Sequence, residues 1–409
     1  MKKLFLIFFA NGLFAAMPSD PLINWDIDRR LPLSSQPTVY FRDEYYWYFN
    51  NQQINTHVYN AQGVPQYQYD EPIGDSSIDI ERAWDIQKES TDILVATIDY
   101  GFDLTHEDLT NNVYVNPIFI DEFGTTNLDM TDHTGHGTMI LSVIAANGNN
   151  NIGGCGVLWR AKILPIKHST RSTKFAQAIN YAVSQGARVI NISDKTDASL
   201  ETKEAIERAA LSNCIIVCSA INANINQDTT EDYPTSWHEP NVLTVSSSKR
   251  DETLDIAAYG SNSVALFAPG RLIIAAWPEN QYRYTTGTSF ATAMVSGSLA
   301  LILEKYPDEP YQKTVNRLLY NVDKFPVYNA SISGGRLNVY KSLIELKLSI
   351  NKDNLIISGA VGQHAQLKYS TNLIQWNNFI DLVLTNDIID LPISLNNNQE
   401  FFKIEQIRP

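Results

Sequence analysis

Four polar residues lie at the edges of predicted core elements, and their side chains together could transfer an acyl group. They are Asp99, His136, Asn222 and Ser289. Acyl transfer to a serine hydroxyl needs a base that takes the proton, a carboxylate that orients the base and a donor for the oxyanion. The four residue types supply each of these parts, so serine chemistry is the first hypothesis for this chain.

Ser289 stands at the start of the stretch 289–305, which is apolar on nearly every side and therefore predicts a buried helix. The start of a helix offers free backbone N–H groups and the positive end of the helix dipole. A hydroxyl at this point could act as a nucleophile beside a developing negative charge. It could equally be an N-cap, and the residue alone does not decide between these roles.

Gly135 and Gly137 flank His136, which leaves the ring uncrowded and allows close approach of the backbone. Asp132 and His133 lie nearby, so a metal site is an alternative interpretation. A zinc-binding helix would instead place two histidines four residues apart with a glutamate between them. The observed spacing therefore favours a base over a metal ligand.

Asp99 and Asn222 also have simpler interpretations when each is taken alone. Asp99 follows the apolar run 93–98 and could cap the next turn, and Asn222 could be a turn residue after the run 215–219. The presence of all four residues in one chain favours the catalytic interpretation.

Short apolar runs alternate with helical stretches from residue 78 to about residue 346. The predicted strands are 93–98, 163–166, 189–192, 215–219 and 242–245, and the predicted helices are 138–146, 175–185, 199–211 and 289–305. This alternation predicts an α/β fold, a mainly parallel sheet with helices on both faces. Ligands of such sheets bind at the carboxyl ends of the strands.

The ends of the chain differ from this central pattern. Residues 1–16 have a basic start, an apolar run and small residues at the end, which predicts a secretory signal peptide. Residues 17–42 are interpreted as a leader or short pro-segment, and residues 43–346 as the catalytic domain with an aromatic N-terminal arm. Residues 347–409 hold short β runs separated by turns, which predict a small antiparallel β module, an accessory or sorting unit.

Composition limits the compartment and the partners. A net charge of −14 argues against nucleic acid and anionic membranes as partners. No stretch after the signal peptide reaches the roughly 18 apolar residues of a spanning helix, so we expect no membrane anchor. We expect the protein to be secreted, periplasmic or on the cell surface. We also expect it to be a monomer. Cys214 and Cys218 would lie roughly 13 Å apart on one strand, so we expect buried thiols rather than disulfides.

The segments around the four polar residues resemble the signatures of the subtilisin-like serine endopeptidases, in that family's order of Asp, His and Ser. The resemblance covers roughly residues 75–345 and includes the segments 82–86, 161–165, 233–234, 267–270 and 334–338. A lone Gly-Thr-Ser would be weak evidence, but the ordered set is specific. The resemblance implies a subtilisin-like fold that hydrolyses peptide bonds in protein or peptide substrates.

The resemblance also implies a role for each residue. Ser289 matches the nucleophile, His136 the general base and acid, and Asp99 the orienting carboxylate. Asn222 matches the oxyanion donor, aided by the backbone N–H of Ser289. No cofactor is required for this chemistry.

A structural calcium site is a further implication of the resemblance. The matching positions are Asp108, Asn150, Ile152 and Gly154, the last two through their carbonyl groups. Calcium takes six to eight oxygen ligands and only four are found here, so a turn-rich loop without metal is the alternative.

Several positions depart from the family pattern. Tyr100 follows the aspartate where a small residue is usual and could alter the setting of Asp99, while Met139 and Ala293 are changes that leave the catalytic groups intact.

The predicted substrate pocket departs more. The pocket for the residue before the scissile bond would be lined by Ser193, Asp194, Ala220 and Ile221. The family usually has Leu-Gly after the serine, where this chain has Asp194 and Lys195, and a glycine in place of Ile221. A β-branched side chain would narrow or block the pocket. The alternative function is therefore a non-catalytic or weakly active peptide-binding protein of the same fold, and a third is an esterase.

Overall fold

The computed structural model describes most of the chain after residue 77. The described residues are 78–169, 174–249, 253–255, 257–351, 354–370, 373–392 and 401–407, together with two short antiparallel strands, β1 (His57–Tyr59) and β2 (Pro65–Gln68). The predicted signal peptide (1–16) and leader (17–42) lie outside the described residues.

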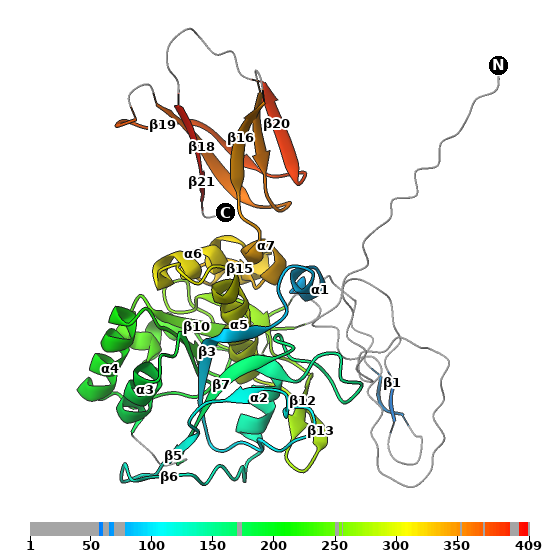
Figure 1. Cartoon of the computed structure of the whole chain (residues 1–409), viewed down its shortest axis with the longest axis vertical. Coiled ribbons are helices and arrows are strands. Elements are labelled where there is room, and N and C mark those ends of the chain that lie inside the picture. The colour runs from blue at the N-terminus through cyan, green and yellow to red at the C-terminus, as the bar shows by residue number, and fades with distance from the viewer. Residues whose placement is uncertain are drawn as a thin grey trace, which may run out of the picture.

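An 11-stranded sheet forms the centre of the molecule (Figure 1). Its parallel strands, in spatial order, are β11 (Leu266–Pro269), β10 (Val242–Ser248), β9 (Ile215–Ser219), β8 (Val189–Ile192), β3 (Ser90–Asp99), β7 (Ala161–His168) and β5 (Ile118–Ile120). Its margins hold β6 (Thr126–Asn127), β4 (Val113–Tyr114), β15 (Gly335–Arg336) and β14 (Asp323–Lys324). The predicted mainly parallel sheet is confirmed.

Helices cover both faces of this sheet because the strands are apolar on both sides. Alternate residues of β3 point to opposite faces, so that Val95 packs into one apolar cluster and Ala96 into the other. The first cluster includes residues of α1 (Ile80–Trp84), α2 (His136–Ala145), α5 (Thr288–Lys305), α6 (Tyr311–Tyr320) and α7 (Val339–Leu343). The second includes residues of α3 (Phe175–Ser184) and α4 (Leu200–Leu211).

Helix α5 is the buried helix that the sequence predicts, and every residue from Thr288 to Leu303 is buried. Beyond its first turn, the hydroxyl side chains of this helix do not require water because they bond to the helix backbone one turn earlier. Thr292 Oγ1 donates to the Thr288 carbonyl at 2.8 Å and Ser298 Oγ to the Met294 carbonyl at 2.7 Å. The helix can therefore cross the core with polar residues at its start.

The topology brings three strand ends to one edge of the sheet. Strands β3, β8 and β9 are neighbours and run parallel, so their carboxyl ends lie together. Asp99 ends β3, Ser193 follows β8, and Asn222 lies three residues after β9. A hairpin, β12 (Ile273–Trp277) with β13 (Gln281–Thr285), leads the chain back to this edge at Ser289.

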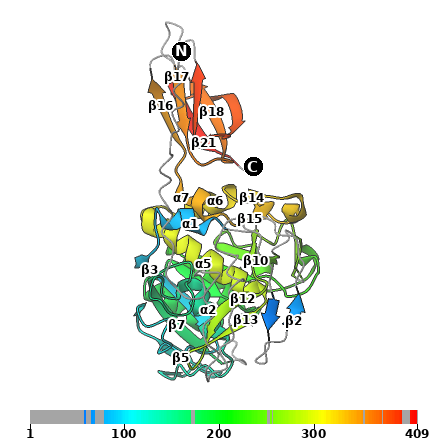
Figure 2. The same cartoon turned by 90° about the vertical axis from the view of Figure 1, so that its right-hand side faces the viewer.

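The C-terminal residues form two small antiparallel sheets beyond α6 and α7 (Figures 1 and 2). One contains β16 (Lys347–Asn351), β17 (Asn354–Ser358) and β20 (Ile388–Pro392), and the other β19 (Asn377–Val383), β18 (His364–Ser370) and β21 (Phe401–Gln406). Ile357, Ala365 and Leu384 form a small core between them. Antiparallel β structure at this end is confirmed.

Short 3-10 turns complete the described structure, at Gln227–Thr229, Thr235–Trp237 and Pro326–Asn329. Cys155, Cys214 and Cys218 are buried thiols, as expected. Among the helices that the structure describes, none combines the length and the apolar character needed to cross a membrane.

Candidate active site

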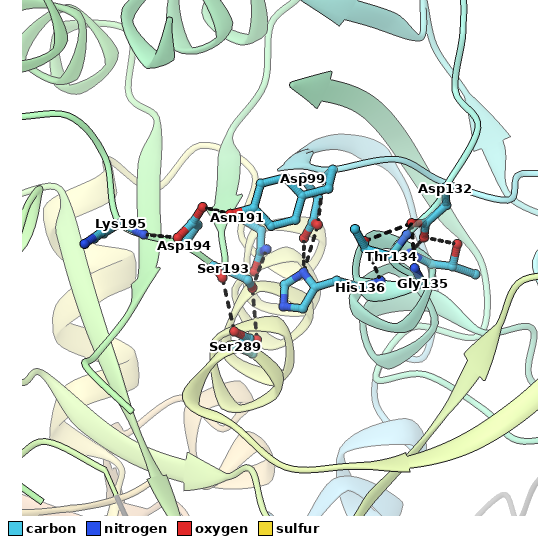
Figure 3. Close-up of polar contacts among 12 residues, drawn as sticks. Asp99, Asp132, Thr134, Gly135, His136, Asn191, Ser193, Asp194, Lys195 and Ser289 are labelled. Atoms are coloured by element: carbon cyan, nitrogen blue, oxygen red, sulfur yellow. Dashed lines mark hydrogen bonds and ion pairs between the residues drawn. The ribbon is translucent and has the colours of Figure 1, made fainter. Parts of the chain in front are cut away.

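Asp99 and His136 form a buried acid–base pair at the end of β3. His136 Nδ1 lies 2.8 Å from Asp99 Oδ1 and 2.9 Å from Oδ2, and the carboxylate is only 2 % exposed (Figure 3). The backbone N–H of Tyr100 also donates to Oδ1, at 2.8 Å. Because the carboxylate accepts a hydrogen bond from Nδ1–H, the neutral imidazole presents unprotonated Nε2 to other groups.

Glycine is required beside His136 for this pair to form. A Cβ at Gly137 would lie 2.1 Å from the carbonyl oxygen of Gly101 and 3.0 Å from Asp99 Cβ. Only glycine lets α2 begin directly against the end of β3. Gly135 has φ +74°, and a Cβ there would overlap the ring of Trp277. The expected close approach on both sides of the histidine is confirmed.

Asp132 fixes the first turn of α2, a role that sequence reasoning missed. Its Oδ1 accepts from the Gly135 N–H at 2.7 Å, and its Oδ2 accepts from the N–H and the hydroxyl of Thr138 at 3.0 and 2.6 Å. These bonds satisfy donors that a helix start leaves unpaired. Within the described part of the chain no group of three His, Cys, Asp or Glu side chains is arranged for a metal ion, so the metal interpretation of His133 and His136 receives no support.

Ser289 lies in the first turn of α5, 7 % exposed, with His136 near it (Figure 3). Its hydroxyl donates to the backbone carbonyl of Ser193 at 3.1 Å. No hydrogen bond between this hydroxyl and His136 is found among the described residues. Such looser contacts are common in active sites without substrate.

A buried polar network joins the start of α5 to β8. Asn191 Nδ2 donates to Ser193 Oγ at 2.9 Å, Ser193 Oγ donates to the Ser289 carbonyl at 3.0 Å, and Ser296 Oγ donates to Asn191 Oδ1 at 2.9 Å. Asn191 is fully buried, so each of these bonds replaces water that it cannot reach. The network sets the position of the serine, and a lone asparagine in a β run gave no sequence signal for it.

Asn222 is oriented by the backbone that precedes the serine. Its Oδ1 accepts from the Thr288 N–H at 2.9 Å, and the residue is exposed to the cavity that Ser289 lines. With the oxygen held in this way, the Nδ2 donors are directed away from Thr288. The side chain is therefore oriented to donate into the cavity.

The charges around His136 favour its protonated form. Burial alone would lower the pKa of the imidazole, but the Asp99 carboxylate, with smaller effects of Asp194 and Asp132, raises it above its ordinary value. A raised pKa makes His136 a stronger base towards a hydroxyl proton.

The predicted pocket residues lie together in one cavity of about 450 Å³. It is lined by Tyr100, His136, Ser193, Asp194, Lys195, Ser219, Ala220, Ile221, Asn222, Glu231, Asp232 and Ser289. Ile221 packs against a small apolar cluster that includes Ala258 and Val264, and the cavity stays open beside it. Ile221 lines this cavity without closing it, and narrowing of the pocket by its β-branched side chain stays a prediction.

Tyr100 and Asp194, two departures from the family pattern, contact each other and both line this cavity. The Tyr100 hydroxyl donates to the Asp194 carboxylate, and burial together with this carboxylate raises the pKa of Tyr100. The Tyr100 ring lies beside both His136 and His168, with centroid distances of 6.0 and 4.9 Å. Asp99 keeps its bonds to His136, so the bulky neighbour does not displace it.

The four predicted calcium ligands are close together but do not form an oxygen cage. Asp108 Oδ1 accepts from Asn150 Nδ2 at 2.8 Å, and Oδ2 accepts from the Gly154 N–H at 3.0 Å. Asn150 Oδ1 accepts from the Ile152 N–H at 2.9 Å. These three oxygens face amide donors, and one carboxylate is a poor donor set for calcium. As placed, the residues do not fit the ion, and calcium binding stays a prediction.

Comparison with known sequences shows similarity over the catalytic region. The model of the subtilase family matches residues 90–336. The major intracellular serine protease of Bacillus subtilis is 32 % identical over 254 residues, which cover 60 % of this chain and 78 % of that protein. Thermitase of Thermoactinomyces vulgaris is 29 % identical over 277 residues, which cover 66 % and 95 %.

Solved structures show the same architecture. A protease of Pseudoalteromonas arctica matches with a TM-score of 0.58 and 23 % identity, over 66 % of this chain and 94 % of that one. The epidermin leader peptide processing serine protease of Staphylococcus aureus matches with a TM-score of 0.56 and 25 % identity, over 65 % and 80 %.

Proposed function

The chain belongs to the subtilase family and is a serine protease, and we propose that it is an endopeptidase that forms an acyl-enzyme on Ser289. The observation that carries this proposal is the buried Asp99–His136 pair together with a serine at the start of α5, with His136 and Ser289 lining one cavity. Each group needed for acyl transfer is present within that cavity or directly behind it.

The proposed reaction moves one proton through His136 in each of its two halves, acylation and deacylation. The Ser289 oxygen attacks the carbonyl carbon of the scissile peptide bond while His136 Nε2 takes the hydroxyl proton. His136 then gives this proton to the leaving amine, and the C–N bond breaks. His136 then takes a proton from water, whose oxygen attacks the acyl carbon, and returns this proton to Ser289 as the ester bond breaks. Asp99 holds the imidazole in the required tautomer throughout and stabilises its charged form.

Asn222 is proposed to stabilise the oxyanion together with the backbone N–H of Ser289. That N–H belongs to the first turn of α5 and has no acceptor within the helix. Both donors and the positive end of the helix dipole would face the oxygen on which charge develops.

Labelling with a fluorophosphonate tests the proposed function directly. We expect a covalent adduct on Ser289, located by mass spectrometry, together with cleavage of an unfolded protein such as casein. The matched control is His136→Ala, which keeps the serine but removes its base and should lose the adduct. Folded protein that neither reacts nor cleaves would support the non-catalytic alternative instead.

Asn222→Ala is expected to lower kcat by about 10²–10³-fold with a small change in KM, the loss known for the equivalent donor of subtilisin. The reason is that the amide bonds to the oxyanion more strongly than to the ground-state carbonyl. Asn224→Ala, an exposed asparagine two residues further on, is the control. Equal losses in both variants would remove Asn222 from the oxyanion site.

Export and a monomeric state are also part of the proposal. The apolar run in residues 1–16 motivates export, and one relative, 29 % identical over 299 residues, is a cell wall-associated protease of Bacillus subtilis. The substrates proposed are proteins or peptides reached outside the cytoplasm.

A further inference from the structure

The cavity beside Ser289 carries an excess of negative charge. Three of its lining residues, Asp194, Glu231 and Asp232, are acidic, and only Lys195 among the described lining residues is a Lys or Arg. Within the part of the chain that the structure describes, none of the three carboxylates has a cationic nitrogen within 4.0 Å. The protein therefore compensates this negative charge only in part, through Lys195 on the same cavity.

Asp232 is the least exposed of these carboxylates, at 9 %. Burial of a carboxylate is costly unless a cation or several donors compensate it. Two other buried carboxylates have such partners, since Asp255 lies 3.3 Å from Arg271 and Glu309 lies 2.5 Å from Arg317. Asp232 differs from them because its open side faces the cavity rather than an arginine.

The Asp232 carboxylate is held in a fixed position. Gln227 Nε2 donates to Asp232 Oδ2 at 3.1 Å, and Gln227 Oε1 accepts from the Ile221 N–H at 3.2 Å, which fixes the direction of the amide. The Asp232 N–H donates to Ser236 Oγ at 2.9 Å. For the second oxygen, Oδ1, no donor is found among the described residues, so it is free to accept from a ligand.

We propose that this cavity binds the side chain of a lysine or arginine that precedes the scissile bond, and that Asp232 is the specificity-determining residue. The inference rests on the proposed function, since the cavity becomes a substrate pocket only if Ser289 is acylated. A guanidinium or ammonium group would supply the missing positive charge and donate to the free oxygen. Asp194 and Glu231 would add to the attraction from the rim.

The other features of the cavity agree with this assignment. A volume of about 450 Å³ lies within the range of pockets that enclose small ligands, so a long side chain has room. Burial raises the pKa of Asp232 to about 6, with Lys195 lowering it and Asp194 raising it, so the group is ionised at neutral pH. Tyr100 holds the Asp194 carboxylate at the His136 side of the cavity.

Peptide p-nitroanilides that differ only in the residue before the scissile bond test the inference. We expect kcat/KM for Arg and Lys substrates to exceed that for Leu, Phe and Glu substrates by at least about 30-fold, the discrimination expected of a buried charge pair. Mass spectrometry of casein fragments should show cleavage after Lys and Arg. This measurement uses the unmodified protein and does not depend on the folding of a variant.

Asp232→Asn removes the charge and keeps an oxygen that can accept from Gln227. We expect the ratio of kcat/KM for Arg over Leu to fall by about 30-fold or more. The control is Glu204→Gln, which removes one negative charge from the exposed face of α4 and should leave the ratio unchanged.

The outcomes separate this inference from the proposed function. A protein that labels with fluorophosphonate and cleaves without preference for basic residues overturns the pocket assignment alone. An active Asp232→Asn variant with an unchanged ratio of kcat/KM for Arg over Leu substrates would also overturn the pocket assignment alone. A protein that neither labels nor cleaves any substrate overturns the proposed function, and with it this inference.

Discussion

Ser289→Ala is expected to abolish proteolysis, with kcat lower by about 10⁶-fold, close to the loss that the same change causes in subtilisin. The hydroxyl forms the covalent bond to the acyl group, and no other nucleophile described in the cavity lies at the start of α5. The background rate should reflect substrate binding and the oxyanion donors alone. Peptide hydrolysis measured at saturating substrate gives the number directly.

The same change should leave the fold intact. The lost hydroxyl donates one hydrogen bond, to the Ser193 carbonyl, which is worth only about 1 kcal/mol. A thermal midpoint within a few degrees of the unmodified protein is expected, and circular dichroism supplies the control. The double variant with His136→Ala should be no slower than either single variant, because the two residues act as one unit. A residual rate near 1 % in the purified single variant would contradict the role given to Ser289.

The fold could be predicted closely where the apolar pattern is continuous. The runs 93–98, 189–192 and 215–219 and the helix 289–305 match β3, β8, β9 and α5 to within a few residues. The hairpin β12–β13 was not predicted although β12 is continuously apolar and buried. Its packing depends on contacts distant in sequence, such as that of Trp277 with the start of α2.

In the candidate site, the catalytic residues could be predicted from the sequence and the residues that position them could not. Asp99, His136, Asn222 and Ser289 stand at element ends and carry a specific order, so each could be selected from the sequence. Their supporting residues could not. Asn191 fixes the serine from within a buried strand, and such a pairing depends on the three-dimensional register of β8 against α5.

Pairs of departures from a family pattern are equally hidden from a single sequence. Tyr100 and Asp194 each weakened the resemblance when read alone, and the structure shows that they bond to each other. Asp232 gave no signal because its burial and its lack of a cationic partner are properties of the fold.

Asp99→Asn is expected to lower kcat by about 10⁴-fold, the loss that this change causes in a serine protease of another fold. The hydrogen bonds of the Asp99 carboxylate explain this loss. Asp99 Oδ1 accepts from the Tyr100 N–H, and an asparagine must keep its oxygen there to satisfy that donor. Its amide would then donate towards His136 Nδ1, so the imidazole proton would move to Nε2, where it blocks removal of the Ser289 proton.

The pH profile distinguishes this loss from simple misfolding. Neutral His136 is the active form, so kcat/KM falls as the pH drops through the pKa of the imidazole, which Asp99 raises above its ordinary value. Without that carboxylate the burial of the ring dominates, and the acid limb should move to lower pH. Asp194→Asn is the matched control, since it removes a charge near His136 without bonding to it. The acid limb of Asp194→Asn should also move to lower pH, but by a smaller amount than that of Asp99→Asn. Its loss of kcat should be far smaller. An acid limb that stays in place in Asp99→Asn would show that Asp99 does not set the protonation of His136.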